Sequence, residues 1–239
     1  MRDEIIAQLN QINTDFYANT AEYFSNTRQY SWEGWDKLWT YFSKHGFQPK
    51  DILDVGCGNG RFVSFLEENL NSFNYTGFDS STSLLDIAKK SHKGANIQFH
   101  QANLLSETSY PKESKYDLIV LFGVMHHVPG YSSRVKLVNN LKSQLKPGGF
   151  IVISVWDFLK QERFKNKLVP WEKLNINERD VEENDYLMNW DKGILAYRYT
   201  HYTSEAEMQR ILKDTSSINV HSYLADGQSK DLNRYYLLQ

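Results

Sequence analysis

Cysteine is almost absent from this 239-residue sequence, because Cys57 is the single one. No disulfide can form within the chain, and we expect a protein of a reducing compartment, the cytoplasm. A run of about 20 apolar residues, the length that spans a bilayer, is missing as well. Residues 1–17 include acidic side chains in place of the basic and apolar regions of a secretory signal peptide. These absences argue against secretion and against insertion into a membrane.

The chain also lacks a large excess of charge of either sign. It has 27 Lys and Arg residues and 29 Asp and Glu residues, a net charge of −2. Nucleic-acid binding would therefore need a local basic patch. Aromatic residues are plentiful, at 14% of the chain, and such side chains often line sites for planar or cationic ligands. For any single aromatic residue, packing in the core is the simpler interpretation.

Short apolar runs alternate with segments of helical length through most of the chain. Residues 1–47 are predicted to form a helical N-terminal cap, because apolar residues recur there at helical spacing. In the remaining domain, 48–239, the alternation predicts an α/β fold with a doubly wound, mostly parallel, seven-stranded sheet. A loop of about eight residues before the last strand is too short for a parallel crossover, so that strand is expected to be antiparallel. The expected strands are 52–55, 75–78, 97–99, 118–122, 150–156, 217–224 and 233–239.

Residues 157–192 break this alternation after the fifth expected strand. Their first part, 157–173, holds five basic and three acidic residues, and their second part, 174–192, holds two basic and six acidic residues. We interpret the segment as a lid-like insertion with small helices of its own that covers a site. A solvated excursion on the surface is the alternative. A further strand, 194–202, and a helix, 204–213, are expected to follow.

A glycine-rich turn follows the first expected strand, in the sequence Ile52-Leu53-Asp54-Val55-Gly56-Cys57-Gly58-Asn59-Gly60. Glycines let a ligand lie against bare backbone, and the helix that follows presents unpaired amides. A dinucleotide-binding turn would place its third glycine one residue later. Asp54, inside the strand, suits a cationic amino group better than a pyrophosphate, which it would repel. A turn with a purely structural role is the remaining alternative.

A second acidic residue, Asp79, ends the second expected strand, 19 residues after Gly60. An acid at this position can accept hydrogen bonds from both hydroxyls of a ribose. Because Asp54 and Asp79 would lie at the carboxyl ends of adjacent strands, both should face the ligand crevice of an open α/β sheet. Ser80 either flanks an adenine edge or packs.

These motifs, together with Lys146-Pro147-Gly148-Gly149 before the fifth strand, resemble the class I S-adenosylmethionine-dependent methyltransferases over residues 50–156. The resemblance implies that S-adenosyl-L-methionine, or its product S-adenosyl-L-homocysteine, lies along the glycine turn and that Asp79 holds its ribose. It places Asn103 where the family usually has an acid for the adenine amino group, and an amide oxygen can accept that bond. The expected cofactor contacts are Tyr17, Arg28, Asp54, Gly56, Cys57, Gly58, Gly60, Asp79, Ser80, Asn103, Leu104 and Phe122.

Two adjacent histidines, His126 and His127, follow the fourth expected strand. In related methyltransferases this segment lies beneath the transferred methyl group. A metal site would need further ligands, which the neighbouring sequence does not offer. A structural role for one histidine and a general-base role, for which we nominate His126, are the remaining interpretations.

Shorter motifs outside the core resemble a narrower family, the tRNA wobble-uridine carboxymethyl methyltransferases. They are Phe16-Tyr17 through Trp32, Ser154-Val155-Trp156, Asp185-Tyr186-Leu187 with Trp190, Arg198-Tyr199-Thr200-His201, and Asp231 with Tyr235-Tyr236. Thr200 and Arg234 depart from that family's pattern. Trp156, Arg198 and His201 follow the fifth strand and the insertion, so we expect them to contact the acceptor. Arg198 and His201, with His126, are the candidate catalytic residues.

Methyl transfer from a sulfonium needs alignment of the acceptor rather than a protein nucleophile. An ionised carboxylate acceptor needs no base and could be held by Arg198, whereas an amine or phenol would call on a histidine. A tRNA acceptor would require a basic patch, for which the basic residues of 160–173 together with Arg198 are the candidate. A small metabolite is the alternative acceptor, and a non-catalytic binding protein or a nicotinamide oxidoreductase fits the motifs less well. The patterns are compatible with an activating partner subunit and do not fix the oligomeric state.

Overall fold

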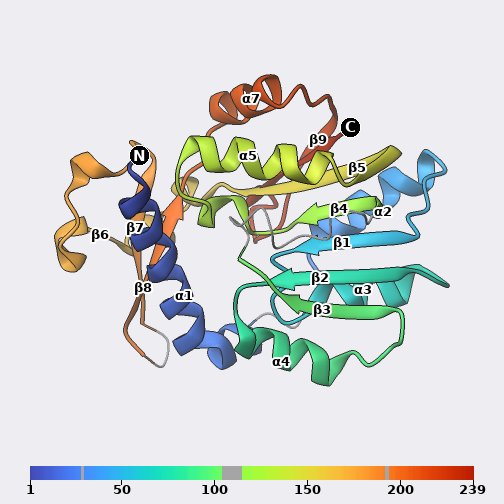
Figure 1. Ribbon diagram of the computed structural model, residues 1–239, viewed down its shortest axis with the longest axis horizontal. Coiled ribbons are helices and arrows are strands. Elements are labelled where there is room, and N and C mark those ends of the chain that lie inside the picture. The colour runs from blue at the N-terminus through green and yellow to red at the C-terminus, as the bar shows by residue number, and fades with distance from the viewer. Residues whose placement is uncertain (28–29, 104–114, 192–193) are drawn as a thin grey trace.

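The computed structural model describes residues 1–27, 30–103, 115–191 and 194–239. Its centre is a seven-stranded sheet in the order β3-β2-β1-β4-β5-β10-β9 (Figure 1). The first five strands along the chain are parallel, and β10 runs antiparallel to both β5 and β9. The strands are β1 Asp51–Val55, β2 Asn74–Asp79, β3 Ile97–Gln101, β4 Tyr116–Leu121, β5 Leu145–Trp156, β9 Asn219–Ala225 and β10 Asn233–Leu238. The predicted α/β class and the antiparallel last strand are confirmed.

Helices cover both faces of this sheet, which is why its central strands β1, β4 and β5 are mostly apolar. One face packs against α5 (Tyr131–Lys142) and α7 (Glu205–Asp214), which lie above the sheet in Figure 1. The other face packs against α2 (Glu33–Lys44), α3 (Arg61–Asn69) and α4 (Thr82–Ser91). The carboxyl ends of the parallel strands stay uncovered by these helices, and this edge can hold a ligand.

A second, smaller sheet lies beside this edge, in the order β6-β7-β8. Its antiparallel strands are β6 (Leu168–Val169), β7 (Asp185–Trp190) and β8 (Ala196–His201). Helix α1 (Asp3–Asn26) packs on it through Ile5 and Leu9, and both lie at one end of the molecule in Figure 1. The segment 157–192 therefore contains two strands as well as the expected short helices. The charged residues of this segment gave no signal for strands. Strand β7 is stabilised by pairing with β8, which follows the segment in the sequence.

The described part of the chain contains no helix that is both long enough and apolar enough to cross a membrane.

Candidate active site

A cavity of about 1160 Å³ lies between the main sheet and the second sheet. Its wall is built from α1, the start of α2, the carboxyl ends of β1, β2, β4 and β5, and strands β7 and β8. Segments far apart in the sequence meet at this cavity. A ligand bound in it would lie between the main sheet on one side and the second sheet with α1 on the other. This position is typical of ligand sites in open α/β sheets.

The glycine turn forms part of the cavity wall. Gly56 and Gly58 both have a positive φ, and both line the cavity together with Cys57. Burial raises the pKa of the Cys57 thiol, so this side chain stays protonated and packs as a small apolar group. Gly60 does not line the cavity, contrary to the expectation that it contacts the cofactor. A Cβ atom at Gly60 would lie 3.1 Å from the Ala88 side chain, and its φ of 77° sets the start of α3.

Asp54 is 3% exposed, yet it lines the cavity. The Tyr75 hydroxyl donates to its Oδ2 atom at 2.7 Å. Burial raises the pKa of Asp54 to about 7, against the lowering effect of this hydrogen bond. A ligand cation beside Asp54 would favour its ionised form, so the site is suited to an ammonium group.

Asp79 orders the turn and faces the cavity with the same carboxylate. Its Oδ2 atom accepts from the Gly58 amide and its Oδ1 atom from the Ser81 amide, both at 2.8 Å. Burial raises the pKa of Asp79, although these amides act in the opposite direction. Ser80 and Asn103 line the cavity next to it. Leu104 and Arg28 lie outside the described residues.

Arg61 is a cavity residue that the sequence analysis missed. Its guanidinium lies 5.0 Å from the Trp32 ring centroid and 5.3 Å from that of Trp35. Within the described ranges no carboxylate lies close enough to form an ion pair with it. Burial lowers the pKa of Arg61 to about 10, which leaves it charged at neutral pH. Its position in the sequence, directly after the glycine turn, could have indicated that Arg61 lies at the site. Phe122 lines the cavity next to these rings.

Both histidines after β4 line the cavity. The Nε2 atom of His127 lies 2.8 Å from the Tyr17 hydroxyl, so α1 and the β4 loop are joined at the cavity wall. The His126 ring lies 5.2 Å from that of Trp156. Neither histidine belongs to the single three-residue group of potential metal ligands found among the described residues, which is Glu182, Asp185 and His201.

Arg198, on β8, also lines the cavity. It is 7% exposed, and its guanidinium lies between two aromatic rings, 5.4 Å from the Phe16 centroid and 5.1 Å from the Trp156 centroid. Its Nη2 atom donates a hydrogen bond to the Met188 sulfur at 3.4 Å. Among the residues whose placement is described, no carboxylate forms an ion pair with Arg198. A buried guanidinium at a cavity wall is chemically suited to an anionic group of a ligand.

His201 does not line the cavity, so the expected contact with the acceptor is wrong. Its two ring nitrogens face Asp185 and Glu207 on the opposite side of β8. The physical reason is strand geometry: residues three apart on a strand point to opposite faces, so Arg198 and His201 cannot both face the cavity.

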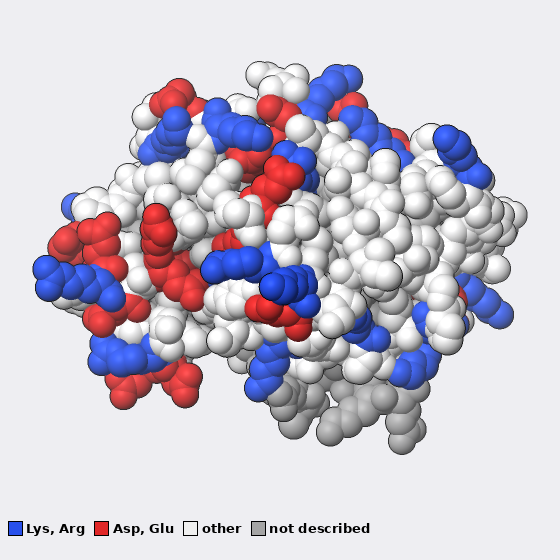
Figure 2. All heavy atoms as spheres, turned by 90° about the horizontal axis from the view of Figure 1, so that it is seen from above, with Lys and Arg blue, Asp and Glu red and all other residues white. Residues whose placement is uncertain are grey.

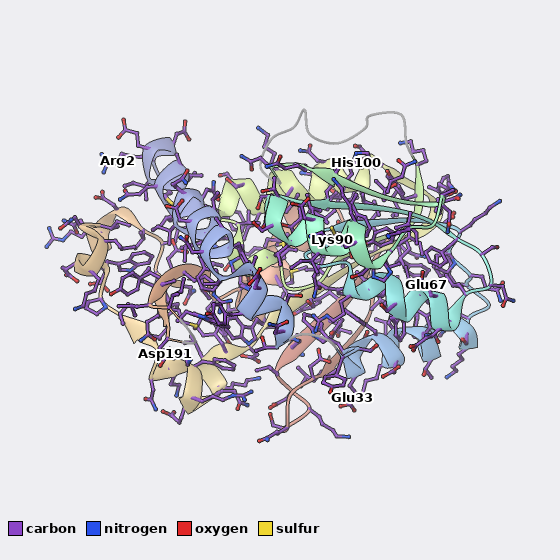
Figure 3. The ribbon with its side chains drawn as sticks, turned by 90° about the horizontal axis from the view of Figure 1, so that it is seen from below. Arg2, Glu33, Glu67, Lys90, His100 and Asp191 are labelled. Atoms are coloured by element: carbon purple, nitrogen blue, oxygen red, sulfur yellow. The ribbon has the colours of Figure 1, made fainter. Side chains whose placement is uncertain are left out.

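The lysines of the segment 160–173 are largely neutralised by neighbouring acids. Lys160 pairs with Asp157, Lys165 with Glu162 at 2.7 Å, and Lys167 with Asp191 at 3.5 Å. Figure 3 shows Asp191 at the end of the molecule that holds the second sheet. The face in Figure 2 likewise shows basic side chains interspersed with acidic ones. The expected basic patch is thus weak, although Arg163 and Lys167 do line the cavity.

Comparison with known proteins agrees with this geometry. A family model described as a methyltransferase domain matches residues 25–216. The chain belongs to the methyltransferase domain family. This assignment confirms the enzyme class predicted from the glycine turn and Asp79.

Several curated relatives of this methyltransferase are named for action on tRNA. One is the probable tRNA methyltransferase 9B of Bos taurus, 27% identical over 184 residues, which cover 74% of this chain and 37% of the relative. Another is the tRNA U34 carboxymethyltransferase of Nautilia profundicola, 25% identical over 216 residues, which cover 82% of this chain and 65% of the relative. The chain thus spans about a third of the length of the 9B relatives it matches.

A solved structure shares the fold of this methyltransferase over nearly its whole length. It is an S-adenosylmethionine-dependent methyltransferase from Clostridium acetobutylicum, with a TM-score of 0.67 and 13% sequence identity. The alignment covers 94% of this chain and 98% of the other. At this identity the likeness confirms the doubly wound methyltransferase fold.

Proposed function

We propose that this methyltransferase transfers the methyl group of S-adenosyl-L-methionine to a carboxylate oxygen of its acceptor. The observation that carries the proposal is Arg198, a buried guanidinium held between two aromatic rings at the cavity wall with no carboxylate partner in the described chain. Removing such a charge from water is costly unless an anion neutralises it. The planar guanidinium also matches a carboxylate through two parallel hydrogen bonds.

The residues around the glycine turn, at the end of the cavity away from Arg198, fit the cofactor. Asp54 would hold the ammonium group and Arg61 the carboxylate of the methionyl part, a pair of opposite charges at one end of the cavity. Asp79 would accept the ribose hydroxyls, while Gly56 and Gly58 leave room for the cofactor against the backbone. When bound, S-adenosyl-L-methionine supplies an already activated methyl group on its sulfonium. The product is S-adenosyl-L-homocysteine.

The protein's own contribution is alignment and exclusion of water. Arg198 fixes the acceptor carboxylate, and the ring of Trp156 shields that contact from solvent. Alignment of two reactants can supply about 7–11 kcal/mol of a displacement barrier. A carboxylate is ionised at neutral pH, so no general base is required. We propose that α1 and residues 157–192 act as a cap and a lid around the cavity.

We propose that this carboxylate belongs to a modified wobble uridine of a cytoplasmic tRNA. The names of the tRNA-directed relatives support this acceptor, and the Trp156 ring could stack on the base. A small carboxylate metabolite is the second candidate. The pairing of Lys160, Lys165 and Lys167 with acids favours it, because a macromolecular polyanion would find few free cations on this segment.

Replacing Arg198 tests the proposal. Arg198→Ala should lower single-turnover methylation about 10–150-fold, the value of a lost charge-assisted hydrogen bond. The affinity for S-adenosyl-L-homocysteine, measured by calorimetry, should stay within about twofold, because Arg198 lies on the acceptor side. Arg210→Ala, an exposed arginine on α7, is the matched control.

The acceptors in this assay are bulk tRNA and a small-molecule extract, each with labelled S-adenosyl-L-methionine. Methyl incorporation into one of them decides between the two candidates. The assay is run with and without added cell lysate, because an activating subunit would restore turnover that the chain alone lacks. Full activity of the Arg198→Ala variant, or loss of cofactor binding in it, would contradict the proposed role.

A further inference from the structure

Five ionisable side chains form a cluster outside the cavity, where the second sheet meets the main fold. Arg134 comes from α5, Glu207 from α7, Asp185 from β7 and His201 from β8, and Glu182 precedes β7. Four of them are almost completely buried, and Glu182 is partly exposed. The proposed methyl transfer uses none of them, so their burial needs another explanation.

The geometry fixes the protonation of His201. Its Nδ1 atom lies 2.8 Å from Oδ1 of Asp185, and its Nε2 atom lies 2.8 Å from Oε2 of Glu207. Ionised carboxylate oxygens only accept hydrogen bonds, so both ring nitrogens must donate. An imidazole ring has two N–H groups only in its charged form. The contacts thus describe an imidazolium between two carboxylates.

The charge balance of the cluster points the same way. Arg134 donates from Nη2 to Glu182 at 2.6 Å and from Nε to Glu207 at 2.8 Å. With His201 charged, two cations face three carboxylates, whereas a neutral His201 would leave Arg134 alone against all three. Burial by itself lowers the pKa of His201, but the hydrogen bonds to Asp185 and Glu207 outweigh it and raise that pKa above its ordinary value.

A bound metal ion is the competing explanation, because one ligand atom each of Glu182, Asp185 and His201 lies within 4.8 Å of the others. Two of these ligands already have donors. Arg134 donates to Glu182, and the Tyr199 hydroxyl donates to Oδ1 of Asp185 at 2.7 Å. The guanidinium and the imidazolium thus supply the positive charge that a metal would bring.

We propose that His201, as an imidazolium, is a positioning residue that fastens the β7–β8 hairpin to α5 and α7 and so holds Arg198 at the cavity. The ladder between the two strands makes the link, because His201 pairs with Asp185 and Arg198 pairs with Met188. A shift at one end of the hairpin would move the other. The fastening itself is independent of the proposed function, and only its consequence for the acceptor rests on it.

The sign of the pH dependence follows from the raised pKa. The folded state binds the proton of His201 more tightly than the unfolded chain does. The stabilisation is complete below the ordinary histidine pKa of about 6.5 and is lost as pH rises through the higher pKa of the folded protein. We expect the hairpin to loosen on the alkaline side, because His201 loses there the proton that it donates to one of its two carboxylate partners.

Nuclear magnetic resonance of the histidine-labelled full chain tests the protonation without any acceptor. His201→Gln assigns the resonance, and His221→Gln, an exposed histidine on β9, is the control. We expect two protonated ring nitrogens at pH 7, a titration above 6.5, and no change on addition of zinc chloride. A neutral ring at pH 7, or zinc binding that His201→Gln abolishes, would overturn the proposal.

Hydrogen exchange tests the fastening. His201→Gln should speed amide exchange in β7 and β8 at least about tenfold at fixed pH and leave β1 and β4 unchanged. Adding Glu207→Gln restores the charge balance of the cluster, so the double variant should regain most of the protection and gives a second test if the single variant unfolds. No change in β7 and β8, equal loosening of both sheets, or no rescue would each count against the proposal.

The consequence for catalysis is read separately. With bulk tRNA as acceptor, His201→Gln should raise the acceptor KM about tenfold while the affinity for S-adenosyl-L-homocysteine stays unchanged, and the wild-type KM should rise at alkaline pH. An unchanged KM alongside a loosened hairpin would overturn the positioning role. Absence of methylation by the wild-type protein would instead speak against the tRNA acceptor, while the resonance and exchange measurements still decide the fastening.

Discussion

Replacing Asp54 with asparagine should make the protein more stable and a poorer cofactor binder. Asp54 is buried, and its pKa in the folded protein is about 7, against 3.8 for the exposed group. The folded state therefore resists ionisation of Asp54, and this penalty grows with pH between the two values. Asparagine has the same shape and no charge, so Asp54→Asn removes the penalty.

Linkage gives the size of the effect. From the two pKa values, the penalty is about 4 kcal/mol at pH 8 and about 2 kcal/mol at pH 5. Loss of the hydrogen bond that Tyr75 donates to the neutral carboxyl group of Asp54 would offset an equal part of the gain at both pH values. The difference between the two conditions is unaffected by that loss. The stabilisation by Asp54→Asn should therefore be about 2–3 kcal/mol larger at pH 8 than at pH 5.

Urea unfolding at the two pH values measures this difference. Asp86→Asn, an exposed aspartate on α4, controls for the loss of one negative charge. A change in the free energy of unfolding that is equal at pH 5 and pH 8 would refute the burial argument. Calorimetry should also show that wild-type affinity for S-adenosyl-L-homocysteine falls as pH drops below 7, and that Asp54→Asn weakens binding and removes this dependence. Binding that is unaltered in the variant would refute the assignment of the ammonium site.

Two further changes probe the cofactor side and the fold. Asp79→Ala should weaken S-adenosyl-L-homocysteine about 10–150-fold, since it removes a charged acceptor and frees the Gly58 amide that shapes the turn; calorimetry measures the affinity, and an unchanged value would exclude the ribose contact. Gly34→Ala should destabilise the protein by about 1–3 kcal/mol, because the new Cβ atom would lie 2.2 Å from Cζ of the buried Tyr235 ring. Thermal unfolding beside the exposed α2 control Ser43→Ala checks it, and equal melting temperatures would contradict the predicted overlap.

The sequence by itself determined the main sheet and the cofactor edge. Apolar runs that alternate with helical segments predict parallel strands with covered faces, and the positions of Asp54 and Asp79 at strand ends place both at one crevice. These inferences depend on local spacing, which the chain carries in full. They correctly predicted the seven-stranded sheet and the family, but not strands β6 and β7.

Only the tertiary structure decided which residues of β8 face the cavity. Arg198 and His201 stand three residues apart on one strand, so alternation separates their faces, but which face meets the cavity depends on how the β7–β8 hairpin packs on α1, α5 and α7. The same holds for Asp54, whose pKa is set by burial beneath elements far away in the sequence. The burial of a side chain and its charged partners both depend on residues from distant parts of the sequence, so no local sequence pattern can predict them.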